Sequence, residues 1–346
     1  MRPDVHSTVS VRAPGRLHLG FLDPAASLGR RFGSVGLVID GYQTVVALGK
    51  STSNEVVAAC ADAAAELDRA DACLRTLRQL TGCHAPLRLQ LLEVLPPHTG
   101  LGSGTQLALA VGRAFAHLHG LEMDSPTLAH ALGRGLRSGI GIAGFDQGGL
   151  LVDGGPGPDG APAPLLARMD LPAAWRVVVV QDPQHRGLSG PQERQALAAL
   201  PPLPQAAAAD ICHQVLMRVL PGAAGGEFGL FAAGVTRMQQ VLGGHFAPAQ
   251  GGTAFTSPAV GRLMAWFADQ HADAAAIGQS SWGPTAFAIV ASPAEAEALV
   301  AAARAAGRIA PGLTVRIVAA RNRGATVARH AASAPQTAEA AAPQSH

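Results

Sequence analysis

Apolar and polar positions along the chain alternate between short β-like stretches and longer helix-like stretches. Residues rich in Val, Ile and Tyr predict strands at 8–11 and 37–48, with a turn at 14–16 between them. Ala, Leu, Arg and Asp at helical spacing predict a helix over 56–80, and 87–94 returns to a strand pattern. The N-terminal part is therefore expected to combine a sheet with helices.

A nearly all-round apolar stretch at 107–118 predicts a buried helix that ends at Gly120. A second helix is expected over 125–136, with Ser125 as its N-cap and Pro126 at its first position. Strand patterns follow at 150–152 and 176–180. The Gly/Pro-rich segment between them is either a hairpin loop or a domain seam.

The second half of the chain alternates helical and strand patterns, which favours an α+β sandwich. Helices are expected at 206–220, 227–242, 257–270 and 293–306. Strands are expected at 287–290 and 314–319. Composition turns to Ala, Thr, Gln and Ser from residue 325, which is typical of a disordered tail. We expect domains at 1–170 and 171–324, followed by a tail at 325–346.

Charge and cysteine content narrow the function classes. The balance is nearly even, with Lys+Arg 26 against Asp+Glu 24, so no global field recruits nucleic acid or an anionic membrane. Lys50 is the one lysine, so the other basic residues are arginines. Arginine suits phosphate binding, although a GC-rich genome also explains the preference for arginine over lysine. The four cysteines form no CxxC pair, and reduced thiols fit best.

Neither a signal peptide nor a membrane span is indicated by the sequence. The first eleven residues carry charges and lack an apolar core, and no apolar stretch approaches the roughly 18 residues that a span needs. We expect a cytoplasmic protein whose partners are small molecules and neither nucleic acid nor membrane. The sequence is compatible with a homodimer.

Three glycine motifs are candidates for phosphate binding. Gly49 to Ser51 follows a strand, but a P-loop needs a glycine where this chain has Thr44. Residues 139–144 have the letters of GxGxxG, yet a helix precedes them and a strand follows, which is the reverse of the Rossmann order. The third motif, LPPHTGLGSGTQ at 95–106, follows a strand and opens the apolar helix, so its context favours it.

The third motif has the composition of an anion-binding loop. Gly100, Gly102 and Gly104 lack side chains at alternating positions, so successive backbone N–H groups can point at one anion with help from the helix dipole. Ser103 and Thr105 add hydroxyl donors. A tight strand-to-helix turn is the structural alternative. The motif predicts a site for a phosphorylated substrate.

The same stretch resembles the second motif of the GHMP kinases, P-x-x-x-G-L-G-S-S, with Gly104 in place of the second serine. APGRLHLG at 13–20 resembles the N-terminal motif of that superfamily, and GQSSWGPT at 278–285 occupies the place of its C-terminal glycine-rich loop. The resemblance implies a two-domain α+β GHMP-kinase-like fold with the active site in the cleft between the domains.

The departures from the kinases point to one branch of the superfamily. Arg16 stands where many kinases have lysine, and GTQ follows the loop. With RLHLGFLD, GGLLVDGG at 148–155 and GLSGPQE at 187–193, the chain resembles the β-ribofuranosylaminobenzene 5'-phosphate synthase family.

That resemblance implies a transferase of tetrahydromethanopterin biosynthesis. It would join phosphoribosyl pyrophosphate to 4-aminobenzoate or 4-hydroxybenzoate, forming a C-glycoside and releasing CO2 and pyrophosphate. An ATP-dependent small-molecule kinase and a non-catalytic binding protein are the alternatives.

Candidate site residues follow from these motifs. Arg16, His98 and Asp146 are expected to be catalytic; an ion pair for Arg16 and a packing role for His98 are the alternatives. Magnesium is the expected cofactor, with Asp23, Asp146 and Glu193 as candidate ligands, and no organic cofactor is expected. His185 and Arg186 are weaker candidates from the second half. The residues expected to bind substrate or phosphate are Gly100, Leu101, Gly102, Ser103, Gly104, Thr105, Gln106, Ser280, Ser281 and Trp282.

The two hydroxyls beside Trp282 form the strongest C-terminal candidate. The indole can stack on a benzoate ring, or it can fill the core.

Overall fold

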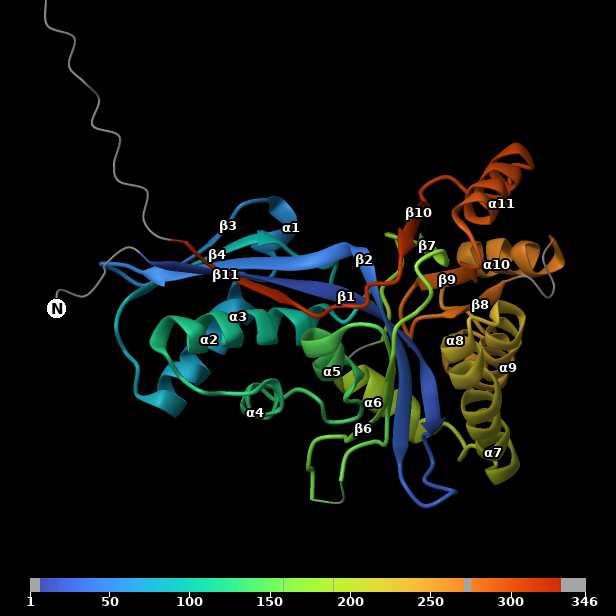
Figure 1. The fold of residues 1–346 in the computed structure, drawn as a ribbon, viewed down its shortest axis with the longest axis horizontal. Helices are drawn as coiled ribbons and strands as arrows, with labels where there is room; N and C mark the ends of the chain where they lie inside the picture. Colours follow the sequence, from blue (N-terminus) through green and yellow to red (C-terminus); the bar gives the residue numbers. More distant parts are fainter. Residues whose placement is uncertain (1–6, 158, 189, 271–274, 331–346) are drawn as a thin grey trace, which may run out of the picture.

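The computed structural model describes residues 7–157, 159–188, 190–270 and 275–330. Two β-sheets carry the fold, and helices cover them (Figure 1). The first sheet has seven strands in the order β11-β1-β2-β4-β3, with β5 paired to β2 and β6 paired to β5. Its strands are β1 (Thr8–Asp23), β2 (Phe32–Lys50), β3 (Glu55–Ala58), β4 (Leu87–Glu93), β5 (Leu150–Asp153), β6 (Leu165–Met169) and β11 (Thr326–His330).

Helices of the N-terminal half bury the apolar face of this sheet. Residues of α2 and α3, among them Leu74, Leu109 and Phe115, pack with Val46 and Leu89 of the strands in one core cluster. The expected apolar helix is confirmed, because α3 is buried along most of its length and ends at Gly120 in a left-handed cap. The helices are α1 (Ala61–Ala64), α2 (Leu67–Thr81), α3 (Ser103–His119), α4 (Ser125–Ala131) and α5 (Ile140–Gln147).

The second sheet has the order β10-β7-β9-β8 and is covered on both faces. Val177 and Val179 of β7 belong to one core cluster and Val178 and Val180 to another, as the alternation of side chains along a strand requires. This double burial explains the unbroken apolar run of β7. The strands are β7 (Arg176–Gln181), β8 (Ala276–Gln279), β9 (Thr285–Val290) and β10 (Thr314–Ala319).

Two helix layers flank the second sheet (Figure 1). On one face lie α10 (Pro258–Gln270) and α11 (Pro293–Ala305). On the other lie α7 (Gln205–Gln214), the π-helical turn η1 (Val215–Val219), α8 (Leu220–Gly225) and α9 (Phe228–Phe246), followed by the 3₁₀ turn η2 (Ala247–Gln250). The short helix α6 (Gly190–Ala199) follows β7. The four helices expected in this half are therefore present.

The two halves share one core. Leu19 of β1 and Leu37 of β2 lie in the same buried cluster as Val177 of β7 and Phe231 of α9. The long strands β1 and β2 extend from the first sheet toward α9 (Figure 1). The Gly/Pro-rich segment before residue 165 is a hairpin loop, because it joins the paired strands β5 and β6.

Several sequence-based expectations are wrong at the level of single elements. Residues 14–16 form no turn; they lie inside β1, whose register against β2 shifts between Pro14 and Arg16. The helix expected over 125–136 ends at Ala131, and its N-cap is Asp124, which accepts a 2.8 Å hydrogen bond from the Thr127 N–H. The helix expected over 56–80 is divided into β3, α1 and α2.

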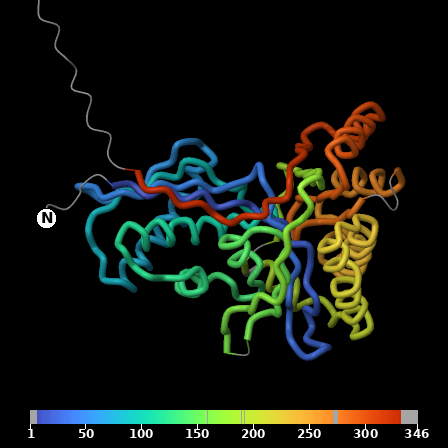
Figure 2. Tube along the Cα trace, in the orientation of Figure 1, coloured from blue at the N-terminus to red at the C-terminus, as the bar shows by residue number. Residues whose placement is uncertain are grey.

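The expected tail at 325–346 also needs correction. Residues 326–330 form β11, which pairs antiparallel with β1 from Thr8↔His330 to Arg12↔Thr326. Figure 2 shows this segment, in red, crossing from the second sheet back to the first. Residues 331–346 of the expected tail lie outside the described residues.

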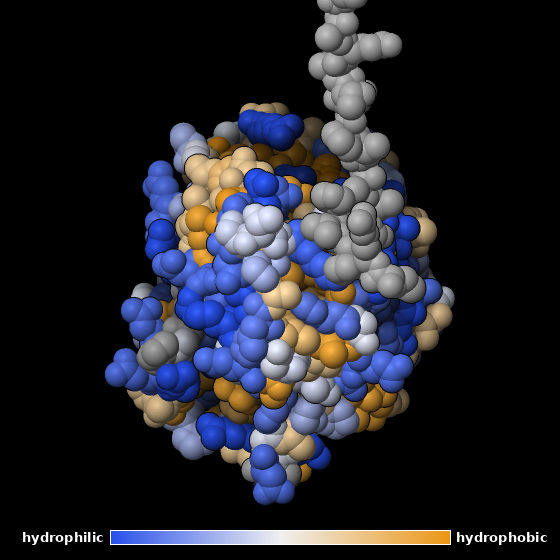
Figure 3. All heavy atoms as spheres, turned by 90° about the vertical axis from the view of Figure 1, so that its left-hand side faces the viewer, coloured by the Kyte–Doolittle hydropathy of each residue, from blue (hydrophilic) through white to orange (hydrophobic). Residues whose placement is uncertain are grey.

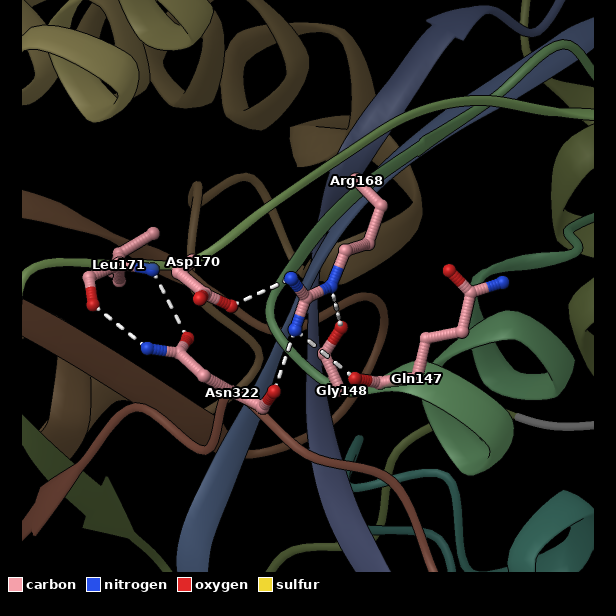
Figure 4. A network of polar contacts seen from close by, with 6 residues as sticks. All are labelled: Gln147, Gly148, Arg168, Asp170, Leu171 and Asn322. Carbon is pink, nitrogen blue, oxygen red and sulfur yellow. Dashed lines mark hydrogen bonds and ion pairs between the residues drawn. The ribbon is translucent and has the colours of Figure 1, made fainter.

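The returning segment is held by polar contacts at the junction of the two halves (Figure 4). The Asn322 side chain accepts from the Leu171 N–H (3.0 Å) and donates to the Leu171 carbonyl (2.8 Å). Arg168 donates to the carbonyls of Asn322 (2.5 Å) and Gly148 (3.3 Å) and pairs with Asp170 (2.6 Å). These contacts connect three chain segments around the point where the second sheet begins.

We expect Asn322→Ala to destabilise the protein by about 1–3 kcal/mol, because both backbone groups of Leu171 lose their side-chain partner. Urea unfolding followed by circular dichroism measures this change. Asn54→Ala, which removes exposed or half-buried contacts to Arg78 and Leu87, controls for loss of an asparagine elsewhere. Equal stability of wild type and Asn322→Ala would contradict the role of the network.

The surface at the end of the first sheet is mixed. Figure 3 shows hydrophilic residues spread over this face, with hydrophobic ones in separate groups among them. Within the described ranges, no helix combines the length and the apolarity that crossing a bilayer requires.

Candidate functional site

The glycine-rich loop between β4 and α3 has a left-handed backbone at three alternating positions. The φ angles are +60° at His98, +92° at Gly100 and +82° at Gly102, and Gly102 is the N-cap of α3. A Cβ atom on Gly100 would lie 2.4 Å from the Ser280 carbonyl oxygen. Glycine is thus required at position 100 for the backbone angle and for the close approach of a second loop.

That second loop, residues 280–284, is locked against the first. The buried Ser280 hydroxyl accepts from the His18 N–H (2.9 Å) and donates to the Gly100 carbonyl (2.7 Å). A Cβ on Gly283 would lie 2.2 Å from the Thr99 carbonyl oxygen. Ser280 therefore ties β1 and both loops together, and its hydroxyl is used within the protein.

A cleft of about 670 Å³ opens beside these loops, and we call it the first lobe. The backbone of the glycine-rich loop and the N-terminus of α3 form one wall. Its charged lining is mostly cationic: Arg16, Arg69, Arg134, Arg137 and Arg186 against Glu66 and Glu193. Guanidinium groups around a helix N-terminus favour a ligand that carries several negative oxygens.

Arg16 lies on β1 and packs against the loop. Its Nη1 donates to the Gly100 carbonyl (2.9 Å), and its guanidinium carbon would be 3.0 Å from a Cβ on Gly102. Burial lowers the pKa of Arg16 to about 10, while Glu193 acts in the opposite direction, so the side chain stays charged at neutral pH. Its Nε has no hydrogen-bond partner among the described residues. The side chain fixes the loop and faces the lobe at once.

Gly104 makes room for two further arginines. A Cβ at this position would lie 2.5 Å from Arg69 Nη2 and 3.3 Å from Arg134 Nη1. The buried Glu66 holds Arg69 through a 2.8 Å ion pair, and burial lowers the pKa of Arg134. The glycine that replaces the second serine of the kinase-like motif thus brings guanidinium groups against the first turn of α3.

A second lobe of about 560 Å³ adjoins the first. Arg16, Thr105, Arg134, Arg137, Glu193 and Ser281 line both lobes, so the two volumes meet at the arginines. The second lobe alone is lined by His18, Phe21 and Phe32, and by Leu197 of α6. Arg31 and Arg194 line it as well, so a cationic lobe joins one whose walls are both aromatic and cationic.

His18 is a buried histidine whose ring nitrogens lack hydrogen-bond partners among the described residues. Burial, and then the charges of Arg16 and Arg137, lower the pKa of His18 to about 3. The ring is therefore neutral at physiological pH.

We expect this histidine to make the protein acid-sensitive. Its folded pKa lies below the ordinary value of 6.5, so the unfolded chain takes up the proton first as pH falls. The contribution of the neutral His18 ring to the free energy of unfolding is therefore fully present above about pH 6.5. As the pH falls from there toward the folded pKa, this contribution decreases by at most about 1.4 kcal/mol per pH unit. Urea unfolding of wild type and His18→Gln between about pH 6.5 and 4.5 measures the difference in slope. Parallel pH profiles would contradict it.

The structure brings most of the predicted substrate residues to the cleft. Arg16, His98, Gly100, Gly102, Ser103, Gly104, Thr105, Ser281 and Trp282 line the first lobe, as does the weaker candidate Arg186. Trp282 is also packed on Phe246, with ring centroids 4.6 Å apart, so it is both a core residue and part of the wall.

Three predicted residues support the site from behind. Leu101 is fully buried in the core. Gln106 is buried too, and its Nε2 donates to the Gly141 carbonyl (2.9 Å). Ser280 bridges the two loops as described above. None of the three lines either lobe.

The three acidic residues predicted to share magnesium do not come together. Asp23 accepts hydrogen bonds from Ala25 N–H (3.1 Å) and Leu28 N–H (2.7 Å) in its own loop and lines neither lobe. Glu193 lines both lobes and pairs with Arg137 (2.6 Å). No group of three potential metal ligands occurs among the residues that the structure describes.

Asp146, predicted to be both catalytic and a metal ligand, lies outside both lobes. It accepts a hydrogen bond from the Ser125 hydroxyl (2.6 Å) and lies 3.5 Å from Arg113. Its contacts connect α3, α4 and α5, so the prediction of a catalytic role is not supported by its position.

Arg69, Arg134 and Arg137 were not identified from the sequence. The alternation of arginine and glycine in GRGLRS at 133–138 was a usable signal, but the overall arginine bias obscured it. The GxGxxG segment is indeed no nucleotide loop, because the Asp153 carboxylate caps it, accepting from the N–H groups of Gly139 (2.8 Å) and Ile140 (3.2 Å).

Comparison with known proteins agrees with this architecture. The chain matches the GHMP kinases N terminal domain over residues 68–149 and the GHMP kinases C terminal family over residues 219–309. Similar solved structures include a homoserine kinase from Cytophaga hutchinsonii, with 17% identity, TM-score 0.64 and 95% and 98% of the two chains covered. The phosphomevalonate kinase of Streptococcus pneumoniae has 13% identity and TM-score 0.67, with 91% and 100% covered. These likenesses show the fold.

Two curated relatives are more similar in sequence, and both are named beta-ribofuranosylphenol 5'-phosphate synthase. The protein of Archaeoglobus fulgidus is 33% identical over 81% of this chain and 87% of its own length. That of Methanothermobacter thermautotrophicus is 30% identical over 91% and 97%. The chain therefore belongs to the β-ribofuranosylphenol 5'-phosphate synthase family of enzymes, within the GHMP kinase superfamily.

Proposed function

We propose that this enzyme joins phosphoribosyl pyrophosphate to 4-hydroxybenzoate or 4-aminobenzoate and forms a ribosyl C-glycoside, as a step of tetrahydromethanopterin biosynthesis. One observation supports this most directly: a lobe with five arginines and a helix N-terminus opens into a second lobe where aromatic side chains stand beside arginines. The name of the relatives specifies a phenol product, which favours 4-hydroxybenzoate for those proteins.

The first lobe suits a sugar diphosphate. As the bond from ribose C1 to pyrophosphate breaks, negative charge grows on the leaving group and positive charge on C1. Charged donors fixed before the reaction stabilise the leaving anion more as the bond breaks. Arg16, Arg69 and Arg134 surround the first turn of α3, where that anion would lie.

The bond changes balance without an oxidant or reductant. The ring carbon that bears the carboxylate supplies an electron pair to C1, and the bond to pyrophosphate breaks. The bond to the carboxyl carbon then breaks, CO2 leaves, and its electron pair restores the aromatic ring. The residues of the cleft bind and orient the two substrates and limit the access of water.

Magnesium enters this proposal with the diphosphate, as part of the substrate. The three acids expected to hold it are dispersed, and Glu66 and Glu193, the acids of the first lobe, pair with arginines. The acids that line the first lobe therefore do not suit a magnesium ion held by the protein itself.

The test is a release assay. Purified protein is incubated with phosphoribosyl pyrophosphate, carboxyl-labelled 4-hydroxybenzoate or 4-aminobenzoate, and magnesium. We expect labelled CO2 and pyrophosphate to appear in equal amounts, and only when both substrates are present. Pyrophosphate without CO2 would indicate simple hydrolysis and would overturn the proposal.

An ATP-dependent kinase is the second candidate, because the fold and the glycine-rich loop are those of the GHMP superfamily. The surroundings of Gly104 speak against it, because a serine at this position would require the Arg69 guanidinium, 2.5 Å from the added Cβ, to move. Incubation with ATP and a sugar or isoprenoid alcohol distinguishes the two. Consumption of ATP that depends on the alcohol would favour the kinase.

A further inference from the structure

We propose that the second lobe is the binding site for an aromatic carboxylate, and that Phe32 is the residue that contacts its ring. This inference rests on the proposed function and adds the place and the specificity residue of the acceptor. The lobe is lined by Phe21 and Phe32, by Leu197 and Ala198 of α6, and by arginines that include Arg31 and Arg194. Aromatic and cationic walls together suit a flat ring that carries a carboxylate.

The aromatic wall is a connected set of rings. His18 and Phe21 meet edge to face with centroids 4.6 Å apart, and Phe21 and Phe32 are 5.3 Å apart. The Arg31 guanidinium lies over the Phe32 ring at 5.0 Å. Phe21 is buried and fixed, whereas Phe32 is half-buried and presents ring surface to the lobe. A ligand ring would extend this row of aromatic contacts.

The backbone at Phe32 is the second observation. Its φ angle is +70°, a conformation that bulky residues rarely adopt, and such strain is concentrated at ligand sites. Gly33 next to it also has positive φ, +66°. The strained turn aims an aromatic side chain at the lobe where asparagine or glycine would fit the backbone more easily.

Charge orients the ligand. Arg16, Arg134 and Arg137 lie where the second lobe meets the first. A carboxylate placed there would be next to a sugar diphosphate in the first lobe, while the ring extends toward Phe32. This is the arrangement that joins the carboxyl-bearing carbon of the acceptor to ribose C1.

The experiment replaces Phe32 with asparagine, which removes the ring but tolerates the left-handed backbone better than phenylalanine. We expect the KM for 4-hydroxybenzoate to rise about tenfold, as loss of an aromatic contact implies, with the KM for phosphoribosyl pyrophosphate unchanged. Phe32→Tyr keeps the ring and should restore the wild-type value. Equilibrium dialysis with labelled 4-hydroxybenzoate gives a readout independent of turnover.

Phe228→Leu is the matched control, since this half-buried aromatic residue lines neither lobe. An unchanged benzoate KM in Phe32→Asn, or an equal rise in both KM values, would overturn the assignment of the lobe. Absence of CO2 release from the wild-type enzyme would instead refute the proposed function, so the two failures are distinguishable.

Discussion

Gly102→Val is expected to abolish turnover while the protein still folds. The φ angle of +82° is strained for a β-branched residue, and the new Cβ would lie 3.0 Å from the guanidinium carbon of Arg16. Arg16 must then give way, and the backbone strain falls on the N-cap of α3. The expected loss of kcat/KM in the CO2-release assay is at least about 10³-fold, since both the amide array and its arginine are displaced.

The other end of the same helix supplies the control. Gly120 caps α3 with φ +67°, and a Cβ atom placed on it would meet no atom within 4 Å outside its own helix and chain neighbours. Gly120→Val carries a similar backbone cost, about 1–3 kcal/mol, far from the cleft. We expect both variants to lose similar stability in thermal unfolding, and only Gly102→Val to lose turnover. If Gly102→Val retains a tenth of the wild-type activity or more, the assignment of the glycine-rich loop as the phosphate-binding site is wrong.

The second large effect is expected for Arg16→Lys. Lysine keeps the positive charge but cannot donate to the Gly100 carbonyl and present a planar fork to the lobe at the same time. We expect kcat/KM to fall by about 10²–10³-fold, the range found when one donor to a developing anion is removed. Steady-state kinetics with varied phosphoribosyl pyrophosphate measures it.

Arg12→Lys on the same strand is the comparison, because this side chain is exposed and lines neither lobe. Its kinetics should match those of the wild type. If Arg16→Lys stays within about threefold of the wild type, Arg16 supports the loop only and does not contact the leaving group.

The sequence predicts the elements whose pattern is local. The apolar run of β7 and the all-round apolar α3 are present as expected, because burial on every side leaves a clear composition. Features that depend on distant partners were missed. β11 is exposed on most of its residues and exists because β1 supplies its hydrogen bonds from the other end of the chain. Residues 14–16 were mistaken for a turn because the pairing of β1 with β2, whose register shifts between Pro14 and Arg16, is not visible in the sequence.

The residues of the candidate site also divide into those that the sequence reveals and those that only the fold brings together. The glycine-rich loop is recognisable because its φ angles and close contacts demand glycine at fixed spacing. The arginines come from β1, from α2, and from the segments after α4 and after β7, and only the fold brings them to one cleft. The structure places Asp23 and Asp146 outside both lobes, where each one accepts hydrogen bonds from neighbouring donors, a role that glycine-flanked sequence does not reveal.

The place of β11 has a consequence for synthesis on the ribosome. β1 is synthesised before the other strands of both sheets, yet β11, which pairs with its free edge, begins only at Thr326. Until then the nascent N-terminal half exposes unpaired N–H and C=O groups, which can pair with another chain. Aggregation during expression is therefore expected to depend on how soon residues 326–330 are synthesised and pair with β1.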